Sequence, residues 1–423
     1  MAEEVVRPLP DYAEALRRAL ENVTALPLQR VTLTDAAGRI LAEDVAADRD
    51  WPPFDRATMD GYALRSEDLA QGRSLQVVGG IAAGAPAQIE LAPGQCCRIA
   101  TGARVPATAD SIVPHEFTDR GEPLVAVSAA AHLSPGDNIH RRGSDARAGQ
   151  RILSAGTQLG AHHLGLCAGF GVTSPLVHSQ PKVAILTTGD EVLPPECASL
   201  LPHQIRNSNA PMLTAALTAM GCCVISCRHV SDDPHLVRAA VMDALATADV
   251  LVTAGGVSAG ARDFLPGALA EVGVETRLRG AAIQPGRPIT LGRISPKPGK
   301  SVEVISLPGN PVSVLATAHL FAWPLFRALS GFSPVLPWIM VSVASEVRPN
   351  PRRQVFRPAV FEPENCSLNV PKWGGSGDLV HTTGTHGLAA LPLQEKVVRS
   401  GEKVAFLPWA WHSIPQPRTG NTV

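Results

Sequence analysis

The chain of 423 residues carries 37 basic and 38 acidic residues, which leaves a formal net charge of -1. This length predicts roughly three domains of about 150 residues each, and so balanced a charge excludes the basic surface that nucleic acid or anionic lipid requires. The acidic first residues precede no apolar segment, and no run of about 18 apolar residues occurs. We therefore expect neither a secretion signal nor a membrane-spanning helix, and we expect the protein to be cytoplasmic.

The eight cysteines include two adjacent pairs but no C-x-x-C spacing. This usage suits neither a zinc site nor a disulfide framework. We interpret the cysteines as small apolar residues of a reduced protein.

The first expected element is an amphipathic helix at residues 11–23, where apolar residues recur at helical spacing. Residues 27–48 predict two short strands around an Ala-Ala-Gly-Arg turn. Residues 75–150 consist of strand-like fragments separated by proline and glycine, without a helix of ordinary length. We therefore expect a β-rich piece in this part of the chain.

From about residue 180 the pattern changes to short apolar strands that alternate with amphipathic helices. The expected strands are 183–187, 222–229, 249–253 and 302–307, and the expected helices are 210–220 and 234–246. This order predicts a parallel, doubly wound sheet, whose ligands bind beyond the carboxyl ends of the strands. After about residue 332 short strands with proline and glycine breaks return, so we expect a second all-β unit at the end of the chain.

Each of the four expected strands runs into a loop of polar or turn-forming residues. These residues are Thr188, Gly189, Asp190 and Glu191; Asp232 and Asp233; Gly255, Gly256, Ser258 and Asp263; and Pro308, Gly309 and Asn310. In a parallel sheet all four loops share one edge, where N–H and hydroxyl groups suit a phosphate ester and carboxylates suit magnesium. Two alternatives stay open: the glycines serve only a tight turn, and Asp232 or Asp233 only caps the next helix.

Two loops are stiffened by proline: one of the four strand-end loops, and a further loop at residues 283–288. In residues 308–311 two prolines flank a glycine and an asparagine, and in residues 283–288 Arg287 offers a guanidinium suited to a tetrahedral oxyanion. The alternative for Arg287 is an ordinary surface arginine. The chain has no G-x-x-x-x-G-K-[ST], no G-x-G-x-x-G after a strand, no H-E-x-x-H and no G-x-S-x-G, which disfavours the chemistries that those motifs serve.

Several long stretches match one known family in the same order. They are residues 53–63 (PFDRATMDGYA), 98–103 (RIATGA) with Glu116, 136–139 (GDNI) with Gly143, 187–191 (TTGDE), 207–209 (NSN), 255–258 (GGVS) with Asp263, Pro285 with Gly286, and 307–311 (LPGNP). On these residues the chain resembles, over nearly its whole length, the molybdopterin molybdenumtransferases, which include the bacterial MoeA proteins and the E domain of gephyrin.

The resemblance implies an α/β plus all-β, multidomain architecture. Its parts would be an N-terminal helix (1–26) that packs with the α/β domain, an elongated linker domain (27–48 and 146–178), a β-rich inserted domain (49–145), a three-layer doubly wound molybdopterin-binding domain (179–331) and a C-terminal β-barrel (332–423). Implied partners are a second copy of the chain as a homodimer, molybdopterin adenylyltransferase and molybdoenzyme maturation proteins.

The resemblance also implies an activity. Family members insert molybdate into adenylylated molybdopterin with Mg²⁺ and release AMP. Glu191, Asp232 and Asp263 would then lie at the metal and pyrophosphate end. The substrate cradle would comprise Thr188, Gly189, Asp190, Gly255, Gly256, Ser258, Pro308, Gly309 and Asn310. Asp60 and Thr101 would reach the site across the dimer interface, whereas sequence alone favours Asp60 as a turn residue before Gly61.

One departure concerns the molybdate end of the implied site. Many family members have Lys-Pro-Gly-Lys-Pro where this chain has Gln284-Pro-Gly-Arg287-Pro. Loss of one well-bonded charge near a dianion removes about 1 to 3 kcal/mol of binding free energy. Arg287, with Arg357 and Ser376 of the last domain, would retain enough of the site for activity. The rival hypotheses are a molybdopterin-binding scaffold with weakened turnover and the related adenylyltransferase step, which does not require the extra β domains.

Overall fold

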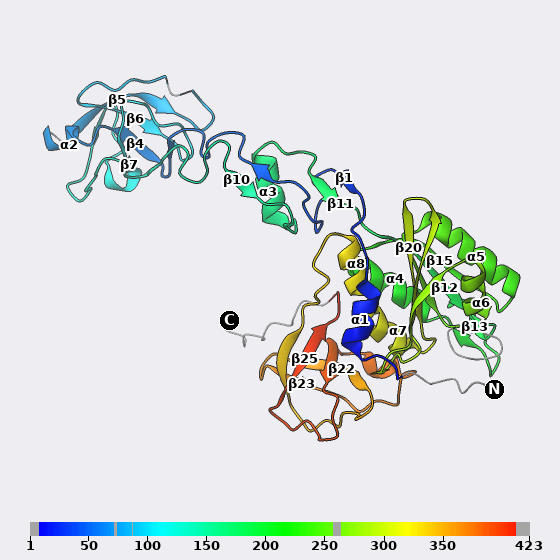
Figure 1. Cartoon of the computed structure of the whole chain (residues 1–423). Coiled ribbons are helices and arrows are strands. Elements are labelled where there is room, and N and C mark those ends of the chain that lie inside the picture. The colour runs from blue at the N-terminus through cyan, green and yellow to red at the C-terminus, as the bar shows by residue number, and fades with distance from the viewer. Residues whose placement is uncertain (1–7, 72–73, 87, 257–263, 412–423) are drawn as a thin grey trace, which may run out of the picture. The chain divides into compact units, whose positions relative to one another are not determined.

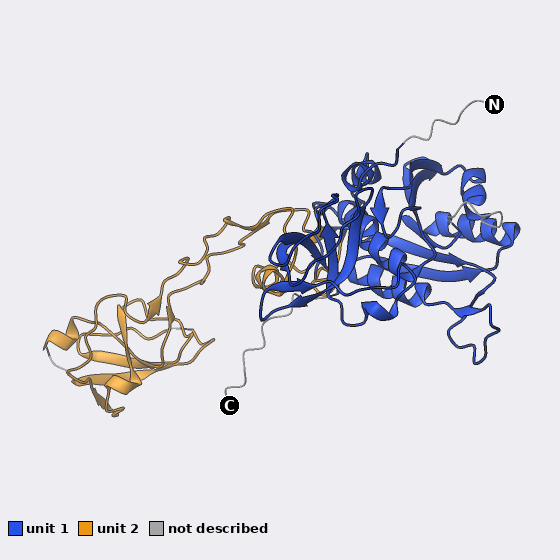
Figure 2. Ribbon diagram, turned by 90° about the horizontal axis from the view of Figure 1, so that it is seen from below, with its two compact units in different colours: residues 1–29, 38–40, 178–423 blue, residues 30–37, 41–177 orange. Residues whose placement is uncertain are grey.

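The computed structural model describes residues 8–71, 74–86, 88–256 and 264–411. The chain divides into two compact units (Figure 2): residues 1–29, 38–40 and 178–423 form unit 1, and residues 30–37 and 41–177 form unit 2. Unit 1 contains an α/β domain and a β-barrel, whereas unit 2 is built from small sheets. Each unit is considered separately below.

The α/β domain is centred on a six-stranded sheet. Its strands, in spatial order, are β15 (Cys223–Val230), β12 (Lys182–Thr188), β16 (Val250–Ala254), β20 (Lys300–Leu307), β19 (Thr290–Lys297) and β17 (Glu275–Arg279). The first four are parallel, as predicted. The sheet also contains β19 and β17, which were not predicted and which are antiparallel. A two-residue turn containing Gly299 joins β19 to β20, and a connection so short permits only an antiparallel pair.

Helices cover both faces of this sheet (Figure 1). On one face α5 (Pro234–Thr247) and α6 (Phe264–Glu271) pack against the strands, with Val241 and Leu251 in their shared core. On the other face lie α4 (Asn209–Ala219), α7 (Pro311–Thr317), η2 (Ala318–Ala322) and α8 (Trp323–Leu329). The predicted three-layer architecture is therefore confirmed.

The continuous helical stretch Pro311–Leu329 is long and apolar enough to cross a membrane by length and composition alone. However, 83% of it is buried inside the protein, where Phe321 and Phe326 belong to the main core of unit 1. This stretch is therefore a core helix of the α/β domain.

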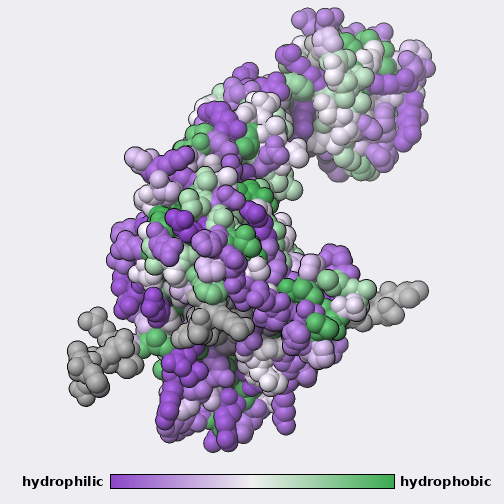
Figure 3. Space-filling view, turned by 90° about the vertical axis from the view of Figure 1, so that its right-hand side faces the viewer, coloured by the Kyte–Doolittle hydropathy of each residue, from purple (hydrophilic) through white to green (hydrophobic). Residues whose placement is uncertain are grey.

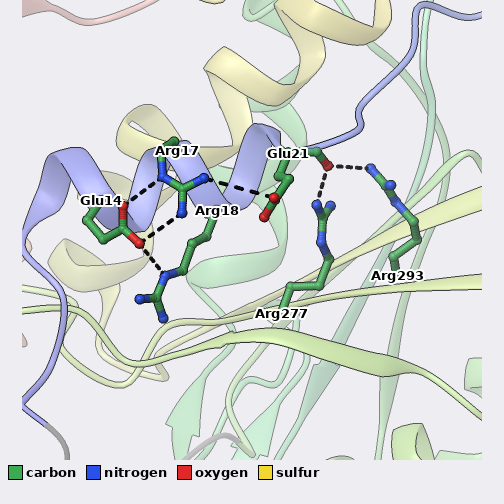
Figure 4. Close-up of polar contacts among 6 residues, drawn as sticks. All are labelled: Glu14, Arg17, Arg18, Glu21, Arg277 and Arg293. Carbon is green, nitrogen blue, oxygen red and sulfur yellow. Dashed lines mark hydrogen bonds and ion pairs between the residues drawn. The ribbon is translucent and has the colours of Figure 1, made fainter.

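The first helix, α1 (Tyr12–Leu20), packs on that same face. Ala15 and Ala19 join the core, and the Tyr12 ring meets Phe321 edge-on. At the end of the helix, guanidinium groups of Arg277 and Arg293 donate to the Glu21 carbonyl (Figure 4). Because the last carbonyls of a helix lack partners within it, these contacts from β17 and β19 anchor α1 to the α/β domain.

On the exposed side of α1, Glu14 accepts from both Arg17 and Arg18 (Figure 4). Those two ion pairs span three and four residues, the spacing at which side chains meet on a helix surface. They lower the pKa of the Glu14 carboxyl to about 2. The charged side of α1 thus faces solvent while its alanines face the core.

The end of the chain forms the predicted β-barrel. Its strands are β21 (Ile339–Val343), β22 (Gln354–Glu362), β23 (Ser367–Asn369), β24 (Gly387–Leu391) and β25 (Lys403–Pro408), and the pairing of β22 with β24 closes the ring. A sixth strand, β18 (Ile283–Gln284), comes from the α/β part of the chain and pairs in parallel with β22. The two domains of unit 1 therefore share hydrogen-bonded backbone.

Unit 2 is β-rich, as predicted. Its main sheet has the order β7 (Ser111–Pro114), β4 (Gly61–Leu64), β6 (Gln95–Ile99), β5 (Ser74–Ile81) and β8 (Leu124–Ala126). Smaller elements of this region are β2 (Val45–Ala46), β3 (Arg56–Ala57), α2 (Asp68–Gln71), η1 (His115–Phe117), β9 (Ile139–His140), β10 (Arg151–Leu153) and α3 (Ala161–Gly169). Strands β1 (Leu28–Arg30) and β11 (Leu176–His178) lie where the units join in sequence. No structural observation tests the finer domain boundaries, which remain predictions.

The face of the molecule drawn in Figure 3 is predominantly hydrophilic, with apolar residues in small groups among polar ones. Larger apolar side chains with high exposure include Val335 at 71% and Val380 at 78%. Singly scattered apolar residues are usual on protein surfaces.

Candidate functional site

A cleft of about 530 Å³ opens at the carboxyl ends of β12, β16 and β20. Its lining consists of Thr187, Thr188, Gly189, Glu191, Val192, Ile205, Arg206, Asn207, Ser208, Asn209, Asp232, Ala254, Gly255, Gly256, Pro288, Pro308, Gly309, Asn310 and Pro311. Residues from all four predicted strand-end loops are present. The inference that these loops share one edge of the sheet is therefore confirmed.

The glycines of the cleft allow its loops to approach closely. Gly255 and Gly256 have φ angles of 93° and 65°, which disfavour any side chain, and a Cβ on Gly256 would come within 2.9 Å of Thr188 Oγ1. A Cβ on Gly309 would touch the Gly255 backbone at 3.7 Å. Tight turning is thus one function of the glycines. Ser258 and Asp263 lie outside the described residues, so the oxyanion seat remains a prediction.

A buried hydrogen-bond network supports the floor of the cleft. Asn207 Nδ2 donates to Thr187 Oγ1 at 2.9 Å, and Asn207 Oδ1 accepts from the Ala210 N–H at 3.0 Å. The Thr187 hydroxyl also forms a hydrogen bond with His229 Nδ1, 3.0 Å away. The network joins β12 and β15 to the start of α4, and it holds the cleft wall at Asn207.

Two asparagines tie the proline-rich loop 308–311 to its surroundings. Asn209 Nδ2 donates to the Gly309 carbonyl at 2.7 Å, and Asn310 Nδ2 donates to Ser376 Oγ of the barrel at 2.8 Å. The Asn209 Oδ1 atom is buried without a hydrogen-bond partner among the described residues. Such an acceptor suits a donor group of a bound ligand.

The structure separates the functions of the neighbouring carboxylates Asp232 and Asp233. Asp233 caps α5, because its side chain accepts from the N–H groups of His235 and Leu236 at 2.8 and 3.0 Å. Asp232 instead lines the cleft and exchanges backbone-to-side-chain hydrogen bonds with Asp190, at 2.9 and 3.4 Å. The capping alternative therefore applies to Asp233 and not to Asp232.

The predicted metal ligands are partly observed. Glu191 and Asp232 both line the cleft, and their carboxylate oxygens are the donors that magnesium prefers. Asp263 lies outside the described residues, and within the described ranges no group of three His, Cys, Asp or Glu side chains is placed to hold a metal. The two observed carboxylates fit a magnesium site, and the site itself remains a prediction.

The residues expected at the molybdate end lie at the junction with the barrel. Gln284 Oε1 accepts from Asn350 Nδ2 at 3.0 Å, and Arg287 is exposed. Arg357 donates from Nη2 to the Pro371 carbonyl at 2.8 Å, and its guanidinium lies 5.8 Å from the centre of the Trp373 ring.

The Arg357 guanidinium is a half-buried cation. Its Nε atom is buried without a partner, and no carboxylate pairs with this arginine in the part of the chain that the structure describes. Burial lowers the pKa of the guanidinium. An unpartnered buried donor on a cation fits an anionic ligand.

Asp60 and Thr101 occupy unit 2, where they contact each other. The Thr101 N–H and hydroxyl donate to Asp60 Oδ1 at 2.6 and 2.8 Å, and together with the nearby His115 they lower the pKa of the Asp60 carboxyl. Gly61 is required for packing, because a Cβ there would lie 1.9 Å from the Val113 carbonyl oxygen. Both side chains are exposed, and their approach to a second copy of the chain remains a prediction.

Several lining residues are absent from the predicted set, among them Arg206, Asn207, Asn209 and Pro288. A signal existed for the two asparagines, because residues 207–209 are among the segments that carry the family resemblance. Nothing local marks Arg206, whose guanidinium donates to the Cys197 carbonyl at 2.6 and 3.1 Å.

The fold and the cleft together define a class: a multidomain α/β protein with a ligand-sized cleft at the carboxyl edge of its parallel strands. Two family models match the chain, "MoeA N-terminal region (domain I and II)" at residues 11–171 and "Probable molybdopterin binding domain" at residues 184–328.

Curated relatives extend this match to most of the chain. A molybdopterin molybdenumtransferase of Nostoc sp. is 33% identical over 95% of this chain and 94% of its own length. A molybdopterin molybdenumtransferase of Synechococcus elongatus is 35% identical over 93% of this chain and 98% of its own length. A solved molybdopterin biosynthesis MoeA protein from Pyrococcus horikoshii, 27% identical, has a TM-score of 0.79 and covers 95% of this chain and 100% of its own. The chain belongs to the molybdopterin molybdenumtransferase family.

Proposed function

We propose that this protein transfers molybdenum from molybdate to adenylylated molybdopterin and releases AMP, as a step of molybdenum cofactor biosynthesis. The observation that supports this proposal most strongly is the cleft at the edge of the parallel strands, within a chain that matches named transferases over at least 93% of its length. The proposal places the enzyme in the cytoplasm.

The proposed binding of substrate follows from the groups in the cleft. The backbone of Gly255, Gly256 and Gly309 and the Thr188 hydroxyl bind the phosphate groups. Glu191, Asp232 and Asp263 would hold Mg²⁺, and the ion would supply positive charge beside the phosphoanhydride oxygens.

The proposed molybdate site lies toward the barrel. Arg357 supplies a half-buried positive charge, and its unpartnered Nε donor is available to an oxyanion. Gln284, Arg287 and Ser376 supply further hydrogen-bond donors. For Ser376 the hydroxyl proton is available to a ligand, because its Oγ accepts from Asn310 Nδ2.

We further propose that the active form is a homodimer, in which Asp60 and Thr101 of one copy reach the cleft of the other. Molybdopterin adenylyltransferase, as supplier of the adenylylated substrate, and molybdoenzyme maturation proteins are the proposed functional partners.

The test is AMP release by the purified protein with adenylylated molybdopterin, Mg²⁺ and millimolar molybdate. We expect AMP and molybdenum-loaded molybdopterin in equal amounts, and Glu191→Gln is expected to reduce the rate at least about 100-fold. Tight binding of molybdopterin without AMP would instead support the scaffold hypothesis. Absence of both binding and release would overturn the proposal.

A further inference from the structure

A chain of hydrogen bonds sets the orientation of the Gln284 side-chain amide. The Arg352 backbone N–H donates to Asn350 Oδ1 at 2.8 Å. Because a backbone N–H only donates, this contact identifies the oxygen of the Asn350 amide and directs its NH₂ group to the other side. There Asn350 Nδ2 meets Gln284 Oε1 at 3.0 Å, so the oxygen of Gln284 is occupied. The Gln284 NH₂ group is left with two N–H donors that have no partner among the described residues.

A second unsatisfied donor belongs to the neighbouring strand β22. Strand β18 pairs in parallel with β22, and Gln284 is opposite Val355. Side chains of opposed residues share a face of a sheet, as do residues two apart, so Gln284, Val355 and Arg357 project from the same face. Arg357 carries the buried, unpartnered Nε. The face therefore presents a cation and a neutral amide that both offer donors, and no carboxylate pairs with that cation in the described ranges.

We propose that Asn350 is a positioning residue, which holds the Gln284 amide with its NH₂ group toward a tetrahedral oxyanion bound by Arg357. A tetrahedral dianion such as molybdate offers only acceptors, so the amide must present nitrogen and not oxygen. The inference rests on the proposed function, in which molybdate is a substrate. It also accounts for a neutral residue where the family resemblance implies an ammonium group, because a fixed orientation would replace part of the lost charge.

The decisive experiment is a double-mutant cycle on Asn350 and Gln284. In Asn350→Asp, one carboxylate oxygen still accepts from the Arg352 N–H, but the other accepts from the Gln284 NH₂ group and so turns the Gln284 oxygen toward the ligand. Gln284→Met removes the amide at similar volume. The added carboxylate charge acts in both backgrounds, whereas the amide reversal acts only where Gln284 is present, so the cycle separates the two effects.

We expect each single variant to raise the KM for molybdate about tenfold or more, with little change in the KM for adenylylated molybdopterin. Asn350→Asp should raise the KM for molybdate by a smaller factor in the Gln284→Met background, where only its charge acts, than in the native background, where the amide reversal adds to it. Fully additive effects would overturn the inference, as would a larger change in the KM for the pterin substrate, which would place Gln284 at its phosphate instead. Gln284→Lys should lower the KM for molybdate.

A binding measurement separates this inference from the proposed function. Calorimetric titration of the purified protein with sodium molybdate requires no turnover, and it should show the same non-additive pattern in Kd. If AMP release occurs but the cycle is additive, the positioning function fails and the transferase stands. Asn365→Asp is the matched control, because Asn365 is an exposed turn residue of the same domain. Asn365→Asp should leave the KM for molybdate, the Kd for molybdate and the melting temperature unchanged.

Discussion

His319 is the most deeply enclosed titratable side chain of the α/β core, and the chemistry proposed above does not use it. Its exposed fraction is 0%. The ring donates from Nδ1 to the Leu315 carbonyl at 2.8 Å, because Nε2 must accept the Ala410 N–H at 3.2 Å. Trp409 packs against it edge-on, with ring centres 4.8 Å apart. This arrangement satisfies only the neutral ring, and burial lowers the pKa of His319 to about 4.

The consequence is a loss of stability in mild acid. An unfolded chain protonates His319 below pH 6.5, whereas the native chain resists protonation down to about pH 4. The free energy of unfolding should therefore fall across this window, by about 3 kcal/mol from this residue alone. Urea unfolding of the native protein and of His319→Gln between pH 7.5 and 4 isolates the effect, since other groups are common to both. A stability difference independent of pH would contradict the prediction.

At the scale of single elements, the start of α5 offers a test of the two neighbouring carboxylates. Asp233→Ala removes the cap and should lower the free energy of unfolding by about 1 kcal/mol, with little change in AMP release. Asp232→Asn keeps the volume of a residue that lines the cleft, so it should reduce AMP release strongly and stability only slightly. Urea unfolding and the AMP assay on both variants decide the matter. Equal effects of the two substitutions on both measurements would refute the division of functions.

The loop between β18 and β19 is held in place by close packing at Gly286. Its φ angle is 102°, and a Cβ there would lie 2.1 Å from Thr317 Cγ2 in buried α7. Gly286→Ala should therefore destabilise the protein by more than about 2 kcal/mol and displace the Gln284 region.

Gly299→Ala is the matched control for this prediction. Gly299 has a φ angle of 78° but open space around its Cβ position, so it carries only the backbone cost of about 1 kcal/mol. Differential scanning calorimetry compares the two variants. Similar melting temperatures would show that steric contact with Thr317 is unimportant.

Comparison of elements shows which features local sequence can predict. The four parallel strands and the helices α4 and α5 were predicted within a few residues, because each is a short apolar run or an amphipathic period bounded by turn residues. Helix α6 and the core stretch Pro311–Leu329 were not predicted. The antiparallel direction of β17 and β19 could not be predicted from local sequence, because strand pairing depends on contacts between segments that are distant in sequence. Likewise the structural importance of Asn207 depends on Thr187, twenty positions away. A local signal did exist for the cap of α5, because Pro234 at the first helical position marks the preceding Asp233 as the N-cap. The proposed site residues Asp60 and Arg357 were named only through the family resemblance.

At the scale of the whole molecule, the proposed dimer makes each site depend on two copies of the chain. Mixing an Asp60→Asn chain with a Glu191→Gln chain tests this dependence, because a mixed dimer would contain one site with both substitutions and one with neither. We expect two inactive proteins to regain about a quarter of the native rate once subunits exchange at random. Native mass spectrometry verifies the exchange. Inactive mixed dimers would show that Asp60 acts on its own chain, and an active Asp60→Asn protein before mixing would show that Asp60 is not needed at the site.

The strand β18 has a consequence for how the molecule can be divided. Its two residues lie in the sequence of the α/β domain, yet they complete a row of hydrogen bonds on the barrel strand β22. A shortened chain that ended at residue 331 would leave this short strand without its neighbour, together with the loop that bears Gln284. The α/β domain is therefore not structurally independent of the barrel. Any fusion or truncation that is meant to preserve the oxyanion end must carry the barrel along with it.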